Sequence, residues 1–274
     1  MIVTSPAATG VVPSLVIDLR DEVASVLPIL DGLARADWQT PTPAVGWNVH
    51  DQVSHLAHFD HLTRLSIQSP VEFASLRDGL TDLQAYIDGI GRGNQWRDGE
   101  ATTAWWRSEN RELRDAATVA EPSTRVPWFG PPMSLASKLT ARIVETWAHG
   151  QDVADTFGVT REPTARLAHV ARIGVLAFAN SFRTRGLSVP DANIRVELSA
   201  PDGFSSWSWG PEDADESVVG DAKEFCLVVT QRCHIADTAL VVRGQNAQRW
   251  MTIAQAFAGQ PGVGRSPNKT VPKA

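Results

Sequence analysis

The sequence predicts an α+β protein, with an N-terminal up-and-down four-helix bundle followed by a small α+β domain. In the N-terminal half, apolar residues recur every three or four positions, as they do in amphipathic helices. Beyond residue 190, two segments alternate with a period of two, which is typical of half-buried strands. The expected domains are residues 1–188 and 189–260, with a flexible tail at 261–274.

The composition is that of a globular protein. The chain has 274 residues, 43% of them hydrophobic and 20% charged, with a net charge of −6. This acidic balance argues against nucleic-acid binding through phosphate attraction. No apolar run approaches the roughly 20 residues of a membrane span, and the N-terminus lacks the basic and apolar regions of a signal peptide. We therefore expect a cytoplasmic protein, monomeric or homodimeric, that binds neither nucleic acid nor membranes.

The two cysteines are not expected to form a disulfide. Cys226 and Cys233 are separated by seven positions of a predicted helix. Their Cα atoms would then lie roughly 10 Å apart along the axis, beyond disulfide reach. We interpret both as small buried hydrophobic residues, which is consistent with a reducing compartment.

Four long helices account for the bundle. Asn48 and Ser134 are the predicted N-caps of the second and fourth, Gly158 ends the fourth, and Pro28 is a potential kink in the first. A connector rich in Pro and Thr separates the first two helices. The helices are expected at residues 14–33, 48–62, 102–119 and 135–157.

The remaining segments are shorter. Between the second and third long helices, an apolar pattern predicts a helix that Gly89, Gly91 and Gly93 end. The stiff aromatic stretch 125–133 is expected to cross the core or to wall a pocket. After it, helices are predicted at 165–184, 221–232 and 246–258, and strands at 194–199, 204–209 and 238–243.

The fourth helix carries the first half of a candidate site. Glu145 and His149 are one helical turn apart and therefore point to the same side. Arg142 and Asp152 share that face, and the flanking positions are apolar. An ionisable face between apolar flanks is expected to point inward, where charge must be paired or bound to metal.

The second helix offers further imidazoles, since four of the seven histidines lie within twelve residues. Asp51, His55 and His58 share one face, whereas His50 and His61 fall elsewhere. Either His55 or His58 could join Glu145 and His149. Two imidazoles and one carboxylate leave a coordination position open, as in catalytic zinc sites. His and Glu ligands favour zinc, although nickel, iron and manganese also bind such sets.

Two motifs resemble those of a known family. The segments Gly46-Trp47-Asn-Val-His-Asp-Gln-Val-Ser-His55 and Arg142-x-x-Glu145-x-Trp-x-His149-Gly-x-Asp152 are similar to motifs of the mycothiol-dependent maleylpyruvate isomerases. That family is a branch of the DinB/YfiT-like metal-binding four-helix bundles. The resemblance implies that His55, Glu145 and His149 bind a divalent metal, and that mycothiol is the thiol co-substrate.

The C-terminal part resembles the sterol-carrier-like domain that follows the bundle in these isomerases. In such enzymes an arginine of this domain can assist the active site, and the candidate in this chain is Arg232. Arg142 or Arg232 is expected to clamp a substrate carboxylate, and His58 to lie near the open coordination position. Asp51 and Asp152 are the expected orienting partners of His55 and His149.

The resemblance implies a metal-dependent enzyme that presents a low-molecular-weight thiol to an electrophilic small molecule. A thiolate that adds to a cis double bond and then leaves gives isomerisation, and one that stays gives S-transfer. Because Trp is abundant near the motifs, a bulky apolar substrate is expected, unless these rings only pack the core. A zinc-dependent hydrolase and a non-enzymatic binding module for an apolar ligand remain alternatives.

Overall fold

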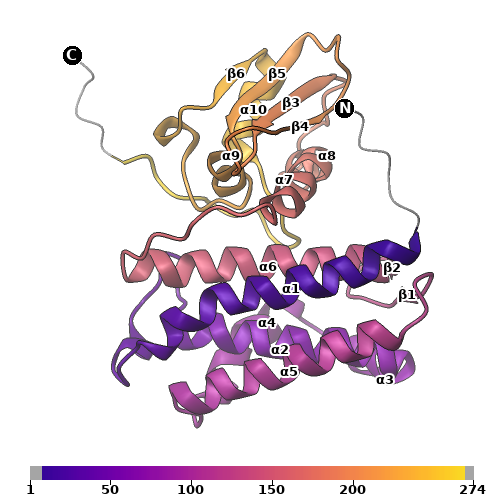
Figure 1. Ribbon diagram of the computed structural model, residues 1–274, viewed down its shortest axis with the longest axis vertical. Coiled ribbons are helices and arrows are strands. Elements are labelled where there is room, and N and C mark those ends of the chain that lie inside the picture. Colours follow the sequence, from indigo (N-terminus) through magenta and orange to yellow (C-terminus); the bar gives the residue numbers. More distant parts are fainter. Residues whose placement is uncertain (1–7, 269–274) are drawn as a thin grey trace. The chain divides into compact units, whose positions relative to one another are not determined.

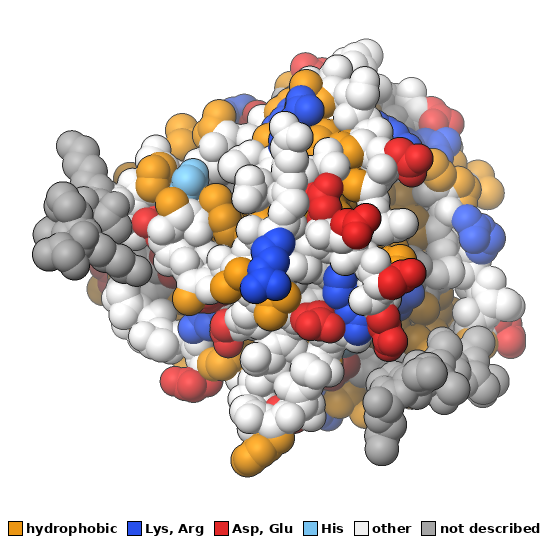
Figure 2. Space-filling view, turned by 90° about the horizontal axis from the view of Figure 1, so that it is seen from above, with side chains coloured by type: hydrophobic (Ala, Val, Ile, Leu, Met, Phe, Trp, Pro, Cys, Tyr) orange, Lys and Arg blue, Asp and Glu red, His pale blue; other side chains and the backbone are white. Residues whose placement is uncertain are grey.

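The computed structural model describes residues 8–268 and divides into two compact units, Met1–Arg161 and Glu162–Ala274. The division falls at residue 161 rather than at the expected 188, because α7 (Leu167–Leu176) packs against α9 (Ala222–Val229). The last residues of the expected tail lie outside the described part. Among the described helices, none is long and apolar enough to cross a membrane. One face of the protein, drawn in Figure 2, carries acidic and basic side chains interspersed.

The first unit is built on α1 (Ala8–Asp31), α2 (Val49–Gln68), α5 (Gly99–Val119) and α6 (Leu135–Thr156), and the four expected long helices are confirmed. Around the bundle their order is α1, α5, α2, α6, so that α1 and α2 lie on one diagonal (Figure 1). Their apolar faces share one core, to which Leu19, Val53 and Leu139 contribute fully buried side chains. The polar faces that carry the predicted site lie on neighbouring helices, α2 and α6.

Both predicted N-caps are confirmed. Asn48 accepts a hydrogen bond from the Asp51 amide, while the Asp51 carboxylate accepts one from the Asn48 amide, which completes a capping box at the start of α2. Ser134 accepts a hydrogen bond from the Ser137 amide at the start of α6. Pro28 lies inside α1, which continues to Asp31. These caps fix where the two helices that carry the candidate ligands begin.

The segment between α2 and α5 differs from the prediction. It forms two helices, α3 (Pro70–Asp78) and α4 (Leu83–Asn94), and the glycine cluster lies inside α4 instead of ending a helix. At Gly91 the reason is close packing, because a Cβ there would lie 1.8 Å from Asp51 Oδ1 and 3.2 Å from Asp51 Cα. Gly91 therefore allows α4 to approach the first turn of α2.

This packing yields a prediction with a matched control. We expect Gly91→Ala to lower the free energy of unfolding by about 1–3 kcal/mol, because α4 must move away from the capping box of α2. Gly89→Ala changes the same helix where a Cβ meets nothing within 4 Å, and it should be neutral or stabilising by up to ~1 kcal/mol. Urea unfolding of both variants is the measurement. Equal stability of the two would show that the contact with Asp51 costs nothing.

The aromatic stretch turns in a short hairpin, β1 (Arg125–Val126) and β2 (Met133–Ser134). Trp128 from its loop stacks on Phe73 of α3 at 5.3 Å between ring centroids, and its ring lies 6.1 Å from that of Phe59 on α2. Phe59 and Phe73 belong to a second small apolar cluster, against which Trp128 and Phe129 pack. The stretch is therefore an aromatic wall beside α2.

The second unit holds a four-stranded sheet in the order β4-β3-β5-β6, formed by β3 (Ile194–Ser199), β4 (Ser206–Trp209), β5 (Glu216–Asp221) and β6 (Val241–Arg243). The expected hairpin of β3 and β4 is confirmed, and β3 also pairs in parallel with β5. The strand β5 was not predicted; it leads directly into a helix, since Asp221 is both its last residue and the N-cap of α9.

The helices of this unit are α7, α8 (Phe178–Arg183), α9 and α10 (Gln245–Ile253). The expected helix 165–184 is interrupted, because Ala177 separates α7 from α8. Cys226 is buried and Cys233 half-buried, and neither forms a disulfide.

Candidate metal centre

Three side chains on α2 and α6 converge as the resemblance implied. His55 comes from α2, and Glu145 and His149 come from α6. Each offers a ligand atom, and these atoms all lie within 4.8 Å of one another. Glu145 Oε2 is 3.6 Å from His55 Nε2 and 3.2 Å from His149 Nε2. Spacing along α6 places Glu145 and His149 together, whereas His55 joins them because α2 packs against α6.

Gln52 holds one of the imidazoles in place. Its Oε1 is 2.5 Å from His149 Nδ1 and can only accept, so Nδ1 donates this hydrogen bond and Nε2, which faces Glu145, is the nitrogen available to a metal. The Gln52 amide in turn donates to Thr42 Oγ1, and Thr42 donates to the Trp47 carbonyl oxygen. Gln52 is fully buried. Gln52 therefore orients the His149 ring, a role that was expected of Asp152.

Gln52 was absent from the sequence prediction, although one signal could have found it. It lies three residues before His55 on the same face of α2. Asp51, the residue proposed to orient His55, is engaged in the capping box instead. The buried Nδ1 of His55 has no hydrogen-bond partner among the described residues.

Aromatic rings flank the two imidazoles. Trp47 stacks on His149 with ring centroids 5.7 Å apart and planes at 17°, and it lies 5.2 Å from His55 in a tilted arrangement. Gly46 before it has a φ of +82°, which favours glycine. The ring of Phe59 also lies close to His55, with the ring centroids 4.4 Å apart. These rings make the surroundings of the three side chains apolar.

The protonation states suit metal binding. Burial, with His149 close by, lowers the pKa of His55 to about 3, so the ring is neutral at pH 7. Burial alone would raise the pKa of Glu145, but the two imidazoles beside it hold that pKa well below the usual value. A neutral imidazole and an ionised carboxylate are the forms that bind a cation. The Glu145 side chain keeps 32% of its surface exposed, which leaves one side of the group open to solvent.

The donor set fits a divalent metal with an open position. In the part of the chain that the structure describes, the group has three members, all nitrogen or oxygen donors. Structural zinc is usually closed by four protein ligands, whereas catalytic zinc keeps a position for water or substrate. The three side chains therefore suit a catalytic site better than a structural one.

The other predicted site residues lie outside this group of three. His58 Nε2 is 2.6 Å from the Tyr86 hydroxyl of α4, and burial together with His61 lowers the His58 pKa to about 4. Arg142 is 2% exposed, where it donates to Asp60 Oδ1 at 2.8 Å and to the Leu56 carbonyl oxygen at 3.2 Å. This buried pairing differs from the expected clamp on a substrate carboxylate.

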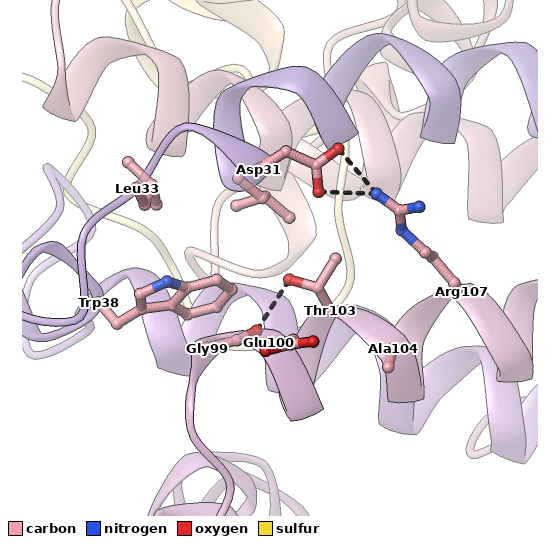
Figure 3. A pocket seen from close by; sticks show the side chains of 9 residues that line it. Asp31, Leu33, Trp38, Gly99, Glu100, Thr103, Ala104 and Arg107 are labelled. Carbon is pink, nitrogen blue, oxygen red and sulfur yellow. Dashed lines mark hydrogen bonds and ion pairs between the residues drawn. The ribbon is translucent and has the colours of Figure 1, made fainter.

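Arg232 belongs to the second unit, where its Nη1 donates to the Thr230 carbonyl oxygen at 2.6 Å. Its expected part in the site stays a prediction. A cavity of about 460 Å³ opens elsewhere on the first unit, between α1, the 3₁₀ turn Asp37–Gln39 and α5. In Figure 3 the ion pair of Asp31 and Arg107 spans it, above Trp38. None of the three candidate ligands lines this cavity.

The fold and the site define a class, helical bundles that present two imidazoles and a carboxylate from two neighbouring helices. Sequence comparison gives the family. The model of the mycothiol maleylpyruvate isomerase N-terminal domain matches residues 19–154, and a model described as wyosine base formation matches residues 190–243. An uncharacterized protein of Mycobacterium tuberculosis, Rv0036c in one strain and MT0041 in another, is 39% identical over 251 residues, which cover 91% of this chain and 97% of that protein.

Crystal structures of the mycothiol-dependent maleylpyruvate isomerase and of a histidine-to-alanine mutant of it share the fold. Their TM-scores are 0.56 and 0.55 at 14% and 13% sequence identity, over 81% of this chain and 89% of theirs. The chain therefore belongs to the mycothiol-dependent maleylpyruvate isomerase-like family. Both the predicted family and the predicted α+β fold class are confirmed.

Proposed function

We propose that this protein is a metal-dependent enzyme that uses a low-molecular-weight thiol, such as mycothiol, to isomerise an electrophilic small molecule or to transfer the thiol to it. The observation that carries the proposal is the convergence of His55, Glu145 and His149 within 4.8 Å. A divalent metal, zinc by preference, would be held by these three side chains and would supply a position at which a thiol is deprotonated at neutral pH. Family membership supports the thiol, and the donor types support the metal.

The chain's own residues prepare this site. Gln52 fixes the His149 ring with Nε2 on the side of Glu145, so that little reorientation is needed when a metal binds. Trp47 and Phe59 place apolar rings against the imidazoles of His149 and His55. A thiolate in such surroundings is poorly solvated and therefore reactive.

The reaction needs no external oxidant or reductant. The thiolate sulfur forms a bond to one alkene carbon, and the π electron pair moves to the conjugated carbonyl oxygen. The former double bond is then single and rotates. When the electron pair returns, the carbon–sulfur bond breaks and the thiolate leaves with the alkene in the trans form. If the enolate is protonated before the sulfur leaves, the product is the thiol conjugate.

The proposal predicts that a thiol perturbs the metal site directly. In the cobalt-substituted protein, added mycothiol should produce a sulfur-to-cobalt charge-transfer band, whereas its S-methyl derivative should not, because a thioether has no ionisable proton. Turnover of a cis-alkenoyl substrate in the presence of mycothiol would then separate isomerisation from conjugation. A cobalt spectrum that does not respond to thiol, in a protein that hydrolyses esters, would favour a hydrolase. A cobalt spectrum that does not respond to thiol, in a protein that hydrolyses no ester, would favour a ligand-binding module.

A further inference from the structure

A buried lysine lies on the ligand-bearing face of α6. Lys138, Arg142, Glu145 and His149 follow one another at spacings of four, three and four residues, so they share one side of the helix. Lys138 is 3% exposed. It is one of four lysines in the chain, and no other lies in the unit Met1–Arg161.

The ionisable groups nearest Lys138 on this face have partners other than its amine. Arg142 is paired with Asp60, and Glu145 lies between two imidazoles. No hydrogen bond or salt bridge joins the Lys138 amine to a described residue. Its contact is the ring of Trp128, whose centroid lies 2.7 Å from Nζ. The inner face of α6 therefore carries one amine without an anionic partner.

The ring of Trp128 does not compensate for this burial. A cation–π contact contributes about 0.5–2 kcal/mol, whereas removing an ammonium group from water costs several kcal/mol. Burial accordingly holds the pKa of Lys138 well below its usual value, and Arg142 adds to this effect, although Glu145 and Asp60 oppose it. An anion that enters beside the amine would supply the missing opposite charge.

An aromatic path connects this amine with the three candidate ligands. Phe59 lies 4.4 Å from His55, the ring of Trp128 lies 6.1 Å from Phe59, and Lys138 sits over Trp128. Along α6, Lys138 and Glu145 are seven residues or roughly 10 Å apart. A flat ligand against these rings could place an anionic group at Lys138 and an alkene near the imidazoles.

We propose that Lys138 is a specificity-determining residue that binds the anionic end of a substrate whose apolar part lies along Phe59 and Trp128. The substrate class is an aryl- or alkenyl-carboxylate with the negative charge at one end and the electrophilic carbon toward His55 and His149. The identity of the reacting carbon rests on the proposed function, whereas the binding of the anionic end by Lys138 is independent of it.

The test compares a carboxylate with its uncharged amide. Wild-type protein should bind trans-cinnamate more tightly than cinnamamide, as measured by tryptophan fluorescence or calorimetry. Lys138→Met should weaken cinnamate by about 10–100-fold, the usual value of a charge-assisted hydrogen bond, and leave cinnamamide unchanged. Lys138→Arg, which keeps the charge, should retain part of the preference. In protein with ¹⁵N-labelled lysine, cinnamate should shift the one side-chain signal that Lys138→Met removes.

Two results would overturn the proposal. One is equal binding of cinnamate and cinnamamide by the wild-type protein, including no binding of either at millimolar concentration. The other is an equal loss of both in a Lys138→Met variant with normal thermal unfolding, which would show that Lys138 only packs the wall. In His149→Ala the preference for cinnamate should persist. Failure of the metal and thiol chemistry would therefore be distinguishable from failure of the role of Lys138.

Discussion

Replacing His149 by alanine is expected to remove the proposed metal and the proposed activity together. The change deletes one of three donors and leaves Gln52 without the imidazole that it holds. A site with two donors is expected to bind the metal too weakly to keep it through purification. Elemental analysis of the native protein and of the variant, both prepared without chelators, measures the effect.

Two controls refine this result. Gln52→Leu keeps all three donors and removes the hydrogen bond to His149, together with the one to Thr42, so metal affinity should fall by about 10–100-fold without vanishing. His61→Ala removes a histidine of the same α2 that pairs with Glu109 outside the group, and metal content should not change. Stoichiometric metal in His149→Ala, or a native protein that binds none, would contradict the proposed centre.

Replacing Asp60 by leucine is expected to have the largest effect on stability. Asp60 is fully buried and accepts hydrogen bonds from Arg142 on α6 and from Trp106 and Asn110 on α5. It therefore joins α2 to both helices that flank it. Its loss leaves the Arg142 guanidinium buried without a counter-charge, which should cost about 3–5 kcal/mol of unfolding free energy in urea.

The double variant Asp60→Leu/Arg142→Met separates charge from packing. It removes both charges at once, so it should be more stable than Asp60→Leu alone, although Trp106 and Asn110 still lack their acceptor. A double variant no more stable than the single one would show that the ion pair is not what Asp60 contributes. The aspartate would then matter mainly for its hydrogen bonds to α5.

Several elements were predictable because the information is local. A helix repeats every 3.6 residues, so the spacing of Glu145 and His149 sets them side by side whatever surrounds them. The caps at Asn48 and Ser134 also depend on neighbours three residues away. The strand β5 and the packing of Gly91 in α4 were missed, because each depends on a partner distant in sequence. Gly91 is explained by Asp51, forty residues before it.

The sequence by itself determined the family, the α+β class and the residue types of the candidate centre, because motifs and periodicity are properties of short segments. Only the tertiary structure decided how those residues are used. It set His55 rather than His58 beside Glu145, and it engaged Arg142 in an ion pair with Asp60. It also left Lys138 as a buried amine facing a ring. The physical reason is that burial and pairing depend on which helix faces pack together, and the spacing within one helix does not specify its neighbour.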